Sequence, residues 1–258
     1  MGKALEVKGA DLSNRLYGRV CGRELTANLL HFQFLPAFYA RRDIRRDGPR
    51  LWGRVLDVGC GNQPYRRYLS PEVEYVALDY PLTQAGLKLG VRPGVYGDAR
   101  TLPFADQSFD AVLCFQVLEH IDRPEAVIRE LARVLKPGGL GLLSVPFCYN
   151  LHLEPHDFFR FSPYGLRALL ESNGLVIREL RGQGGIGTLV VQLFHNWLFS
   201  GLSRQARRHV LFRALAGLML PVLLFLSALG NLAALALDFL NRKDLRFTPN
   251  LWVRAEKA

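Results

Sequence analysis

The chain has 258 residues, of which 49% are hydrophobic and 22% are charged. This size is enough to bury a full core, and it fits one enlarged α/β domain better than two independent domains. The four cysteines form no CxxC pair and have no metal-ligand spacing, which excludes a disulfide framework and predicts a cytoplasmic protein with reduced thiols. The net charge of +10 suits nucleic acid, anionic lipid or acidic substrates, but an arginine-rich composition alone would produce it.

Residues 1–50 are predicted to form an N-terminal helical extension. Helical periodicity runs from about residue 12 to residue 39, and the arginine-rich stretch at 41–54 predicts a solvated linker. Tyr17, His31 and Tyr39 are candidate substrate contacts, and a packed structural face is the competing interpretation for each.

A buried strand followed by a glycine loop is predicted at VLDVGCG, residues 55–61. The apolar run ends in Asp-x-Gly-x-Gly, and glycine at 59 and 61 permits positive φ angles, so a ligand can lie against bare amides at the mouth of a parallel sheet. A nicotinamide dinucleotide is disfavoured because its G-x-G-x-x-G fingerprint needs a third glycine where this loop has Pro64. The loop therefore indicates another nucleotide-like cofactor.

Short apolar runs alternate with helical stretches after this loop, which is typical of a parallel sheet with helices on both faces. One helix is expected to begin with a capping box of Asp122 and Glu125 and to end at Lys-Pro-Gly-Gly, residues 136–139. A second is expected to run from Ser162 to Gly174. Strands are predicted at 55–59, 75–79, 94–97, 110–115, 140–145, 175–180 and 251–255.

Four ordered segments within residues 54–180 resemble the class I S-adenosylmethionine-dependent methyltransferases, in the branch with the methyltransferase type 11 domain. The segments are VLDVGCG, LDY at 78–80, GDARTLPFADQSFDAVLCFQVLEHI at 97–121 and LKPGG at 135–139. The resemblance implies a Rossmann-like seven-stranded sheet with an antiparallel last strand and helices on both faces. It also implies a methyltransferase domain at 51–258 that uses S-adenosyl-L-methionine.

The same resemblance implies which residues hold this cofactor. Gly59, Cys60 and Gly61 would cradle its amino-acid part, and Asp57 would reach the ammonium directly or through water. Asp79 would contact both ribose hydroxyls. Alternatively, Asp57 only caps the following turn, and Asp79 is only an exposed residue at the end of a strand. Further contacts are implied for Tyr80 at the adenine face, Asp98 and Ala99 at its exocyclic amine, and Phe115 and Gln116 around the methionine part. The loop departs from the longest family form because Gln63 replaces its last glycine.

Candidate catalytic residues lie after the fourth and fifth strands. Alignment of the nucleophile supplies roughly 7 to 11 kcal/mol in such reactions, so a general base helps without being indispensable. His120 follows the fourth strand, where packing under the pocket is its competing role. His156 lies in HLEPHDFFRFS, residues 152–162, which resembles a run in bacterial type 11 methyltransferases. Asp157 is a third candidate, or it forms a structural clamp with Arg160.

No metal site is predicted. His152 and His156 have the spacing of two ligands on a helix, but Pro155 argues against a regular helix there. A third ligand is not obvious from the sequence.

Residues 186–246 are predicted to form a hydrophobic helical insert before the last strand. The part at 214–237 has no ionisable side chain and is long enough to span a bilayer, but the chain must return to the sheet, which allows two crossings or none. Pro221 and a polar stripe on each predicted helix favour none, so the insert is expected to contact the membrane interface, with flanking arginines facing anionic headgroups. A buried lid or a dimer interface is the competing interpretation.

These observations predict an enzyme at the cytoplasmic face of the membrane that methylates a hydroxyl on a hydrophobic small molecule, a lipid or a lipid-linked glycan. A non-catalytic membrane or assembly module that retains the fold is the alternative. Nucleic-acid methylation is disfavoured, because CFQV at 114–117 stands where enzymes acting on base amines carry a tetrapeptide such as Asn-Pro-Pro-Tyr. A homodimer is compatible with the sequence.

Overall fold

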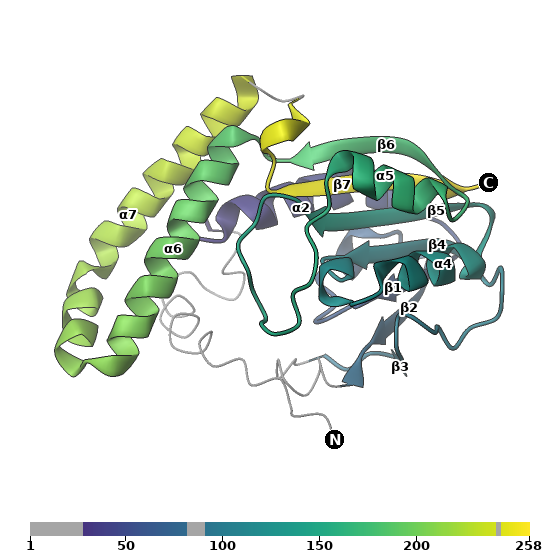
Figure 1. The fold of residues 1–258 in the computed structure, drawn as a ribbon, viewed down its shortest axis with the longest axis horizontal. Helices are drawn as coiled ribbons and strands as arrows, with labels where there is room; N and C mark the ends of the chain where they lie inside the picture. The colour runs from purple at the N-terminus through teal and green to yellow at the C-terminus, as the bar shows by residue number, and fades with distance from the viewer. Residues whose placement is uncertain (1–27, 82–90, 241–243) are drawn as a thin grey trace.

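A seven-stranded sheet forms the centre of the computed structural model, which describes residues 28–81, 91–240 and 244–258. The strand order is β3-β2-β1-β4-β5-β7-β6 (Figure 1). Strands β1 to β5 pair in parallel, whereas β7 is antiparallel to both β5 and β6. The predicted fold class, including the antiparallel last strand, is confirmed. The strands are β1 Arg54–Val58, β2 Glu74–Asp79, β3 Val95–Tyr96, β4 Phe109–Phe115, β5 Leu135–Pro146, β6 Leu175–Gln183 and β7 Asn250–Lys257.

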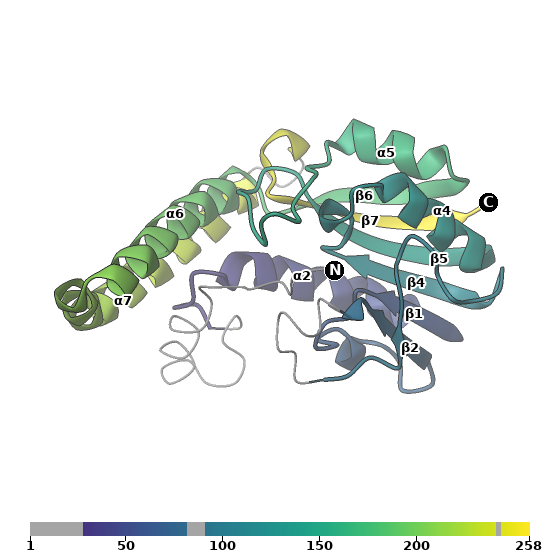
Figure 2. The same ribbon diagram turned by 60° about the horizontal axis from the view of Figure 1, so that its bottom comes forward.

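Helices cover both faces of the sheet. Helices α4 (Pro124–Val134) and α5 (Pro163–Glu171) lie on one face, and α2 (Phe34–Asp47) lies on the other (Figure 2). All residues of the central strand β4 are therefore buried, as expected for a parallel strand between two helical layers. The carboxyl ends of β1, β2, β4 and β5 meet at one edge, which is where open α/β sheets bind ligands. Short 3₁₀ turns are η2 Gly48–Arg50, η3 Arg66–Tyr68, η4 Leu118–His120 and η5 Leu245–Phe247.

Capping signals predicted the start of two helices, and the structure confirms the predicted N-cap of only one of them. The capping box at α4 is wrong: its N-cap is Arg123 without a side-chain cap, and Asp122 instead accepts a hydrogen bond from Arg100 (2.7 Å). The Lys-Pro-Gly-Gly segment is also part of β5 rather than a helix end alone. At α5 the prediction is confirmed, because Ser162 accepts a hydrogen bond from the Gly165 amide (3.1 Å).

The arginine-rich stretch predicted as a linker is helical through Asp47, so that prediction is wrong for its first half. The reason lies in two buried carboxylates on the sheet-facing side of α2. Asp43 and Asp47 both accept hydrogen bonds from Arg181 of β6, at 3.1 and 2.7 Å. Trp252 of β7 donates to Asp47 as well (2.9 Å). Asp43 and Asp47 therefore hold α2 against the sheet. Tyr17, a candidate substrate contact, lies in residues 1–27, outside the described residues.

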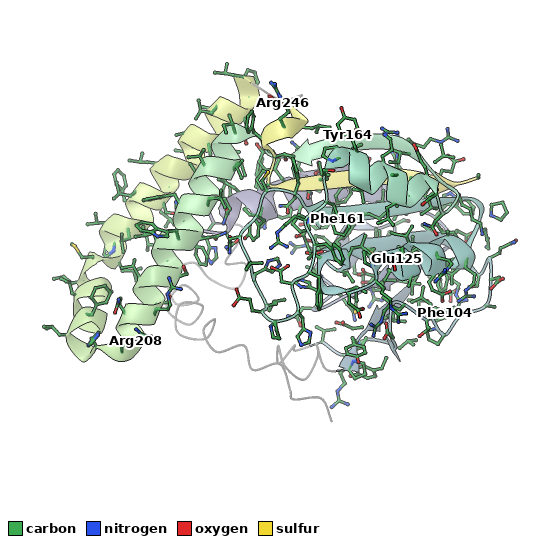
Figure 3. The ribbon with its side chains drawn as sticks, in the orientation of Figure 1. Phe104, Glu125, Phe161, Tyr164, Arg208 and Arg246 are labelled. Atoms are coloured by element: carbon green, nitrogen blue, oxygen red, sulfur yellow. The ribbon has the colours of Figure 1, made fainter. Side chains whose placement is uncertain are left out.

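The predicted hydrophobic insert forms a helical hairpin that projects from the edge of the sheet (Figure 1). Its helices are α6 (Ile186–Arg208) and α7 (Val210–Leu240), and they pack along each other. Arg208 lies at the free end and Arg246 beside the sheet (Figure 3). By length and composition α7 holds one stretch long and apolar enough to cross a membrane, Ala214–Leu240, and only 28% of its apolar window is buried.

The polar stripes of this hairpin are buried and its apolar side chains are exposed. Asp238 accepts hydrogen bonds from Thr188 of α6 and from Tyr39 of α2 (2.5 and 2.8 Å), so these polar groups satisfy one another inside the protein. Every exposed residue between Ala214 and Leu240 is apolar. The buried polar residues are Thr188, Gln192, His195, Ser227, Asn231 and Asp238; the large exposed ones include Val190, Phe194, Trp197, Leu218, Phe225, Leu229 and Leu232.

Candidate active site

The loop after β1 presents open space beside bare backbone. Gly59 and Gly61 have φ angles of +71° and +52°, which favour glycine. The amides of Gly59 and Cys60 donate to the Leu78 carbonyl (2.9 and 3.1 Å), which fixes the loop against β2. A Cβ on Gly59 would lie 2.4 Å from Val117, whereas a Cβ on Gly61 would meet no atom within 4 Å. A ligand can therefore approach the backbone at Gly61.

Asp79 connects the end of β2 to this loop. Its carboxylate is buried and accepts hydrogen bonds from the amides of Gly61 (3.1 Å) and Tyr80 (2.8 Å). The acid predicted to contact a ribose thus lies directly beside the open space, while the Tyr80 side chain is exposed. A buried carboxyl group beside an open stretch of glycine backbone fits the hydroxyls and the amino-acid part of a nucleotide-like cofactor.

Asp57 lies under the same loop and is also buried. The Tyr75 hydroxyl donates a hydrogen bond to it. Burial raises the pKa of Asp57 to about 7, and the nearby Asp79 adds to the increase while the Tyr75 hydrogen bond opposes it. The site therefore holds a carboxyl group that a bound cation would favour in its charged form.

Asp98 was predicted to accept a hydrogen bond from the adenine amine, but its carboxylate already binds another residue. Arg100 binds the Asp98 carboxylate through its backbone amide (2.9 Å) and through its guanidinium (2.7 Å). The Arg100 side chain holds the pKa of Asp98 below its usual range. Ala99 is buried beside this pair. An adenine amine would have to share the Asp98 carboxylate with Arg100.

A cavity of about 350 Å³ lies at the carboxyl ends of β4 and β5, under α2. Phe115 stacks on Trp252 (4.9 Å between ring centroids) and forms one wall. Gln116, with φ +55°, donates a side-chain hydrogen bond to Ser144 (2.9 Å). The cavity is lined by Gln33, Pro36, Ala37, Ala40, Tyr65, Phe115, Gln116, His120, Ser144, Tyr149, His152, Leu153, Gln183, Asn250 and Trp252. Its lining is apolar or uncharged apart from the two histidines.

These histidines come from different elements. His120 ends η4, and His152 lies in the loop after β5; their rings meet edge to face with centroids 4.8 Å apart. Burial lowers the pKa of both imidazoles. Glu119 lies behind them, fully buried, and burial raises its pKa to about 8. Uncharged imidazole nitrogens at a cavity wall can accept a proton or bind a metal.

The loop at 150–161 orients His152 more directly than His156. Asp157 is held by Arg160 through two hydrogen bonds (2.6 and 2.7 Å) and accepts one from the His152 amide (2.8 Å). Burial raises the pKa of Asp157, but these contacts outweigh it and bring the pKa to about 2. This arrangement is the clamp considered for Asp157 and Arg160. The His156 side chain is exposed and lies outside the cavity lining, although its carbonyl accepts a hydrogen bond from His120 (2.6 Å).

The structure thus brings His120 and His152 together at the cavity, with Glu119 behind them, although the sequence placed these residues in two separate clusters. Tyr39 contacts the hairpin and His31 is buried; neither lines the cavity. The sequence shows Glu119 and His152, but it does not show that they lie close together. Their association depends on how the loop folds back over η4, where the Phe158 amide donates to the Glu119 carbonyl (2.7 Å).

Residues 56–143 match the family model described as a methyltransferase domain. A ubiquinone biosynthesis O-methyltransferase of Xanthomonas axonopodis pv. citri is 38% identical over an alignment of 155 positions, which covers 50% of this chain and 65% of that protein. A phthiotriol/phenolphthiotriol dimycocerosates methyltransferase of Mycobacterium ulcerans is 41% identical over an alignment of 96 positions, which covers 33% of this chain and 35% of that protein. The chain thus spans less than two thirds of the length of these curated relatives.

One solved structure shares the fold over most of the chain. The (4+2)-cyclase SpnF superposes with a TM-score of 0.54 at 21% identity, covering 86% of this chain and 81% of that one. A likeness at this identity concerns the fold alone, and one fold supports many activities. The ordered motifs, the methyltransferase domain matched at residues 56–143 and the strand order with antiparallel β7 agree with one another and support a class I methyltransferase fold.

Proposed function

We propose that this protein transfers a methyl group from S-adenosylmethionine to a hydroxyl group of a hydrophobic acceptor. The observation that carries the proposal is the open space at Gly61, where a Cβ would meet nothing within 4 Å, directly beside the buried Asp79 carboxylate. A methyltransferase domain with an open glycine loop and an acid at this position fits the cofactor of its family.

The cofactor, when bound, supplies a methyl group on a positively charged sulfur. The chain's own residues hold and align the reactants, which is the main requirement for an in-line transfer. Asp57 and Asp79 offer carboxylates to the cofactor's ammonium and hydroxyls, and Phe115 and Gln116 form the wall shared with the cavity. Helix α2 forms one wall of the cavity through Pro36, Ala37 and Ala40.

The lining of the cavity supports a hydrophobic acceptor. Aromatic and aliphatic side chains surround it, and its polar groups are neutral amides, hydroxyls and the two imidazoles. Such a surface suits an aromatic or isoprenoid body with one hydroxyl to orient. The names of the two relatives, a ubiquinone-pathway O-methyltransferase and a dimycocerosate methyltransferase, favour a lipid or lipid-like acceptor.

The first experiment measures cofactor binding by calorimetry. Wild-type protein is expected to bind S-adenosylmethionine and S-adenosylhomocysteine, and Asp79→Ala is expected to weaken both at least tenfold. Glu74→Ala, an exposed position on the same strand, serves as the control and should bind as the wild type does. Absence of binding in the wild type, or equal binding by Asp79→Ala, would reject the proposal.

Transfer itself is tested with tritiated methyl donor and fractionated cell extract that includes membranes. Label in an extractable lipid or small molecule, followed by its identification, would establish the acceptor. The cyclase among the fold neighbours shows why this step matters, since the fold alone leaves other activities open. Cofactor binding without any labelled product would favour the non-catalytic alternative, and label in RNA would point to nucleic acid.

We further propose that the α6–α7 hairpin attaches the enzyme to the cytoplasmic face of a lipid bilayer. A helix lying at the interface keeps a polar face toward water, but the polar stripes here are buried between the helices. The exposed surface of α7 is apolar around its circumference between Ala214 and Leu240, which suits immersion in hydrocarbon. Arg204 and Arg208, exposed near the free end, suit anionic headgroups.

Flotation with liposomes tests this attachment. Wild-type protein is expected to float with phosphatidylcholine vesicles containing phosphatidylglycerol, and the Leu218→Gln/Phe225→Gln variant is expected to remain largely at the bottom. Tyr164→Gln, which changes an equally exposed side chain on α5, is the matched control. In a Trp52→Phe background, brominated lipids should quench Trp197, which is 68% exposed on α6. A wild-type protein that stays at the bottom with every lipid would reject the proposal.

A further inference from the structure

Three side chains with metal-ligating atoms converge behind the cavity wall. Glu119, His120 and His152 each offer one ligand atom, and these atoms lie within 4.8 Å of one another. They come from η4 and from the loop after β5, segments that are separated by about thirty residues of chain. This separation indicates that the tertiary fold assembles the group.

The hydrogen bond of His120 fixes which nitrogen is available. Its Nδ1 lies 2.6 Å from the His156 carbonyl, and a carbonyl can only accept, so Nδ1 carries the proton. The lone pair is therefore on Nε2. That atom lies 3.8 Å from Glu119 Oε1, too far for a hydrogen bond and suitable for two ligands of one ion.

His152 is oriented in the same way. Its Nδ1 lies 3.4 Å from Asp157 Oδ2 and 3.4 Å from the Asn150 carbonyl, both of which are acceptors. The lone pair is again left on Nε2. A histidine that donates its second nitrogen to a carboxylate or a carbonyl is the usual arrangement around protein-bound metals.

Glu119 supplies the observation that distinguishes this group from an ordinary polar cluster. Its side chain is completely buried, and both carboxylate oxygens lack a hydrogen-bond partner. Buried polar atoms almost always have a hydrogen-bond partner, so two buried oxygens without one point to a bound water or ligand.

We propose that Glu119, His120 and His152 bind a divalent first-row metal ion, with Zn²⁺ favoured by the ligand set. Two histidines and one glutamate are a ligand set of catalytic zinc, which keeps a further position open. Both histidines line the cavity, whereas Glu119 lies behind it, so the open position faces the space assigned to the acceptor. The sequence-based expectation of no metal paired His152 with His156; the structure pairs it with His120.

This inference rests on the proposed function for its chemical meaning. A hydroxyl of the acceptor would take the open position, and coordination lowers the pKa of a bound hydroxyl. The metal would thereby orient the acceptor oxygen and favour its deprotonated form, and the released proton would pass to solvent water.

The test uses the full chain with any affinity tag removed and metals stripped with a chelator. Zn²⁺ is titrated by calorimetry, and Co²⁺ is titrated while its visible absorption is recorded, because the band intensity reports coordination geometry. We expect one ion per chain, and at least tenfold weaker binding in His152→Ala and in Glu119→Gln. His156→Ala is the matched control in the same loop, since its side chain lies outside the group, and it should retain the wild-type affinity.

Circular dichroism of each variant separates lost ligands from lost folding. If Glu119→Gln fails to fold, His152→Ala, at a half-buried loop position, still decides the question. Substoichiometric binding by a folded wild type, or binding that His156→Ala removes and His152→Ala does not, would overturn the proposal. Because this experiment measures metal binding, a protein that binds no metal can still bind the cofactor in the titrations above. A protein that binds metal but no cofactor would show that the metal site has no part in methyl transfer.

Discussion

Two buried carboxyl groups lie under one glycine loop, and Asp57 is the one whose charge depends on pH near neutrality. Its pKa is about 7 because it is buried, so Asp57 is mostly neutral at pH 6 and mostly anionic at pH 8. A cationic cofactor binds the anion better. We therefore expect the affinity for S-adenosylmethionine to increase with pH, by roughly tenfold between pH 6 and pH 8 if the contact is direct.

Calorimetry of wild type and Asp57→Asn across this pH range checks the expectation. The ratio of the two affinities is the readout, because it cancels the titration of groups on the cofactor itself. The ratio should increase with pH. A ratio that stays constant would indicate that Asp57 only orders the loop.

Gly61 can be compared with a second glycine that has the same backbone strain. Gly61 and Gly138 have φ angles of +52° and +72°, and a Cβ on either would meet nothing within 4 Å. Alanine at either position should therefore cost a similar amount of stability, about 1 to 2 kcal/mol. Only Gly61→Ala places its methyl group in the proposed cofactor cradle, so only this variant should lose cofactor binding.

Urea unfolding measures the first effect and calorimetry the second. Equal cofactor affinity of the two variants would show that the open space at Gly61 is not used.

At this scale the sequence predicted the position of the glycine loop after β1 better than that of the cavity. Asp57, Gly59, Gly61 and Asp79 are close in sequence to the strands that place them, so spacing alone locates them. The group around Glu119 could not be predicted, because its properties come from burial and from a loop that returns from beyond β5. Sequence spacing suggested His152 and His156 instead, which lie in the same loop but face different surroundings.

Helix α2 is an element whose position depends on a few buried charges. Asp47 is fully buried and accepts hydrogen bonds from Trp252 and Arg181, so removing its carboxylate leaves both donors without this acceptor. We expect Asp47→Ala to lower the free energy of unfolding by about 3 kcal/mol. Glu171→Ala, which breaks an exposed pair with Arg167 within α5, should cost about 0.5 kcal/mol or less.

Denaturant titrations of the two variants give these values directly. Equal losses would mean that the buried network contributes no more than a surface pair.

The periodicity of a helix predicted both hairpin helices but not which stripe faces inward. Polar residues at helical spacing were expected to belong to a membrane-interface helix, and six of those that the structure describes are instead buried, with Asp238 bound by Tyr39 of α2. Hydropathy cannot make this distinction, because an apolar helix with a polar stripe looks the same whether water or a partner helix lies beside the stripe. The partner residue Tyr39 lies about two hundred positions away in the chain.

For the whole molecule, net charge and the hairpin act on membrane binding in different ways. The net charge of +10 attracts anionic vesicles over a distance that salt shortens, whereas burial of apolar side chains is insensitive to moderate salt. We expect 0.5 M NaCl to slow association with anionic vesicles several-fold and to leave most of the already bound protein attached.

Stopped-flow light scattering measures the association rate, and flotation in salt measures what remains bound. Complete release by salt would indicate that binding is electrostatic and that the hairpin stays outside the hydrocarbon.

The α6–α7 hairpin joins the sheet at two neighbouring positions, which makes it replaceable in principle. The last aligned pair of β6 and β7 is Gln183 and Asn250, so the chain leaves the sheet and re-enters it at adjacent positions. Antiparallel strands in this arrangement need only a two-residue turn between them. Everything from 184 to 249 is therefore exchangeable in principle without altering the register of the sheet. The α6–α7 hairpin is therefore a separable segment, and a protein of this fold could gain, lengthen or lose it while keeping the same seven-stranded sheet.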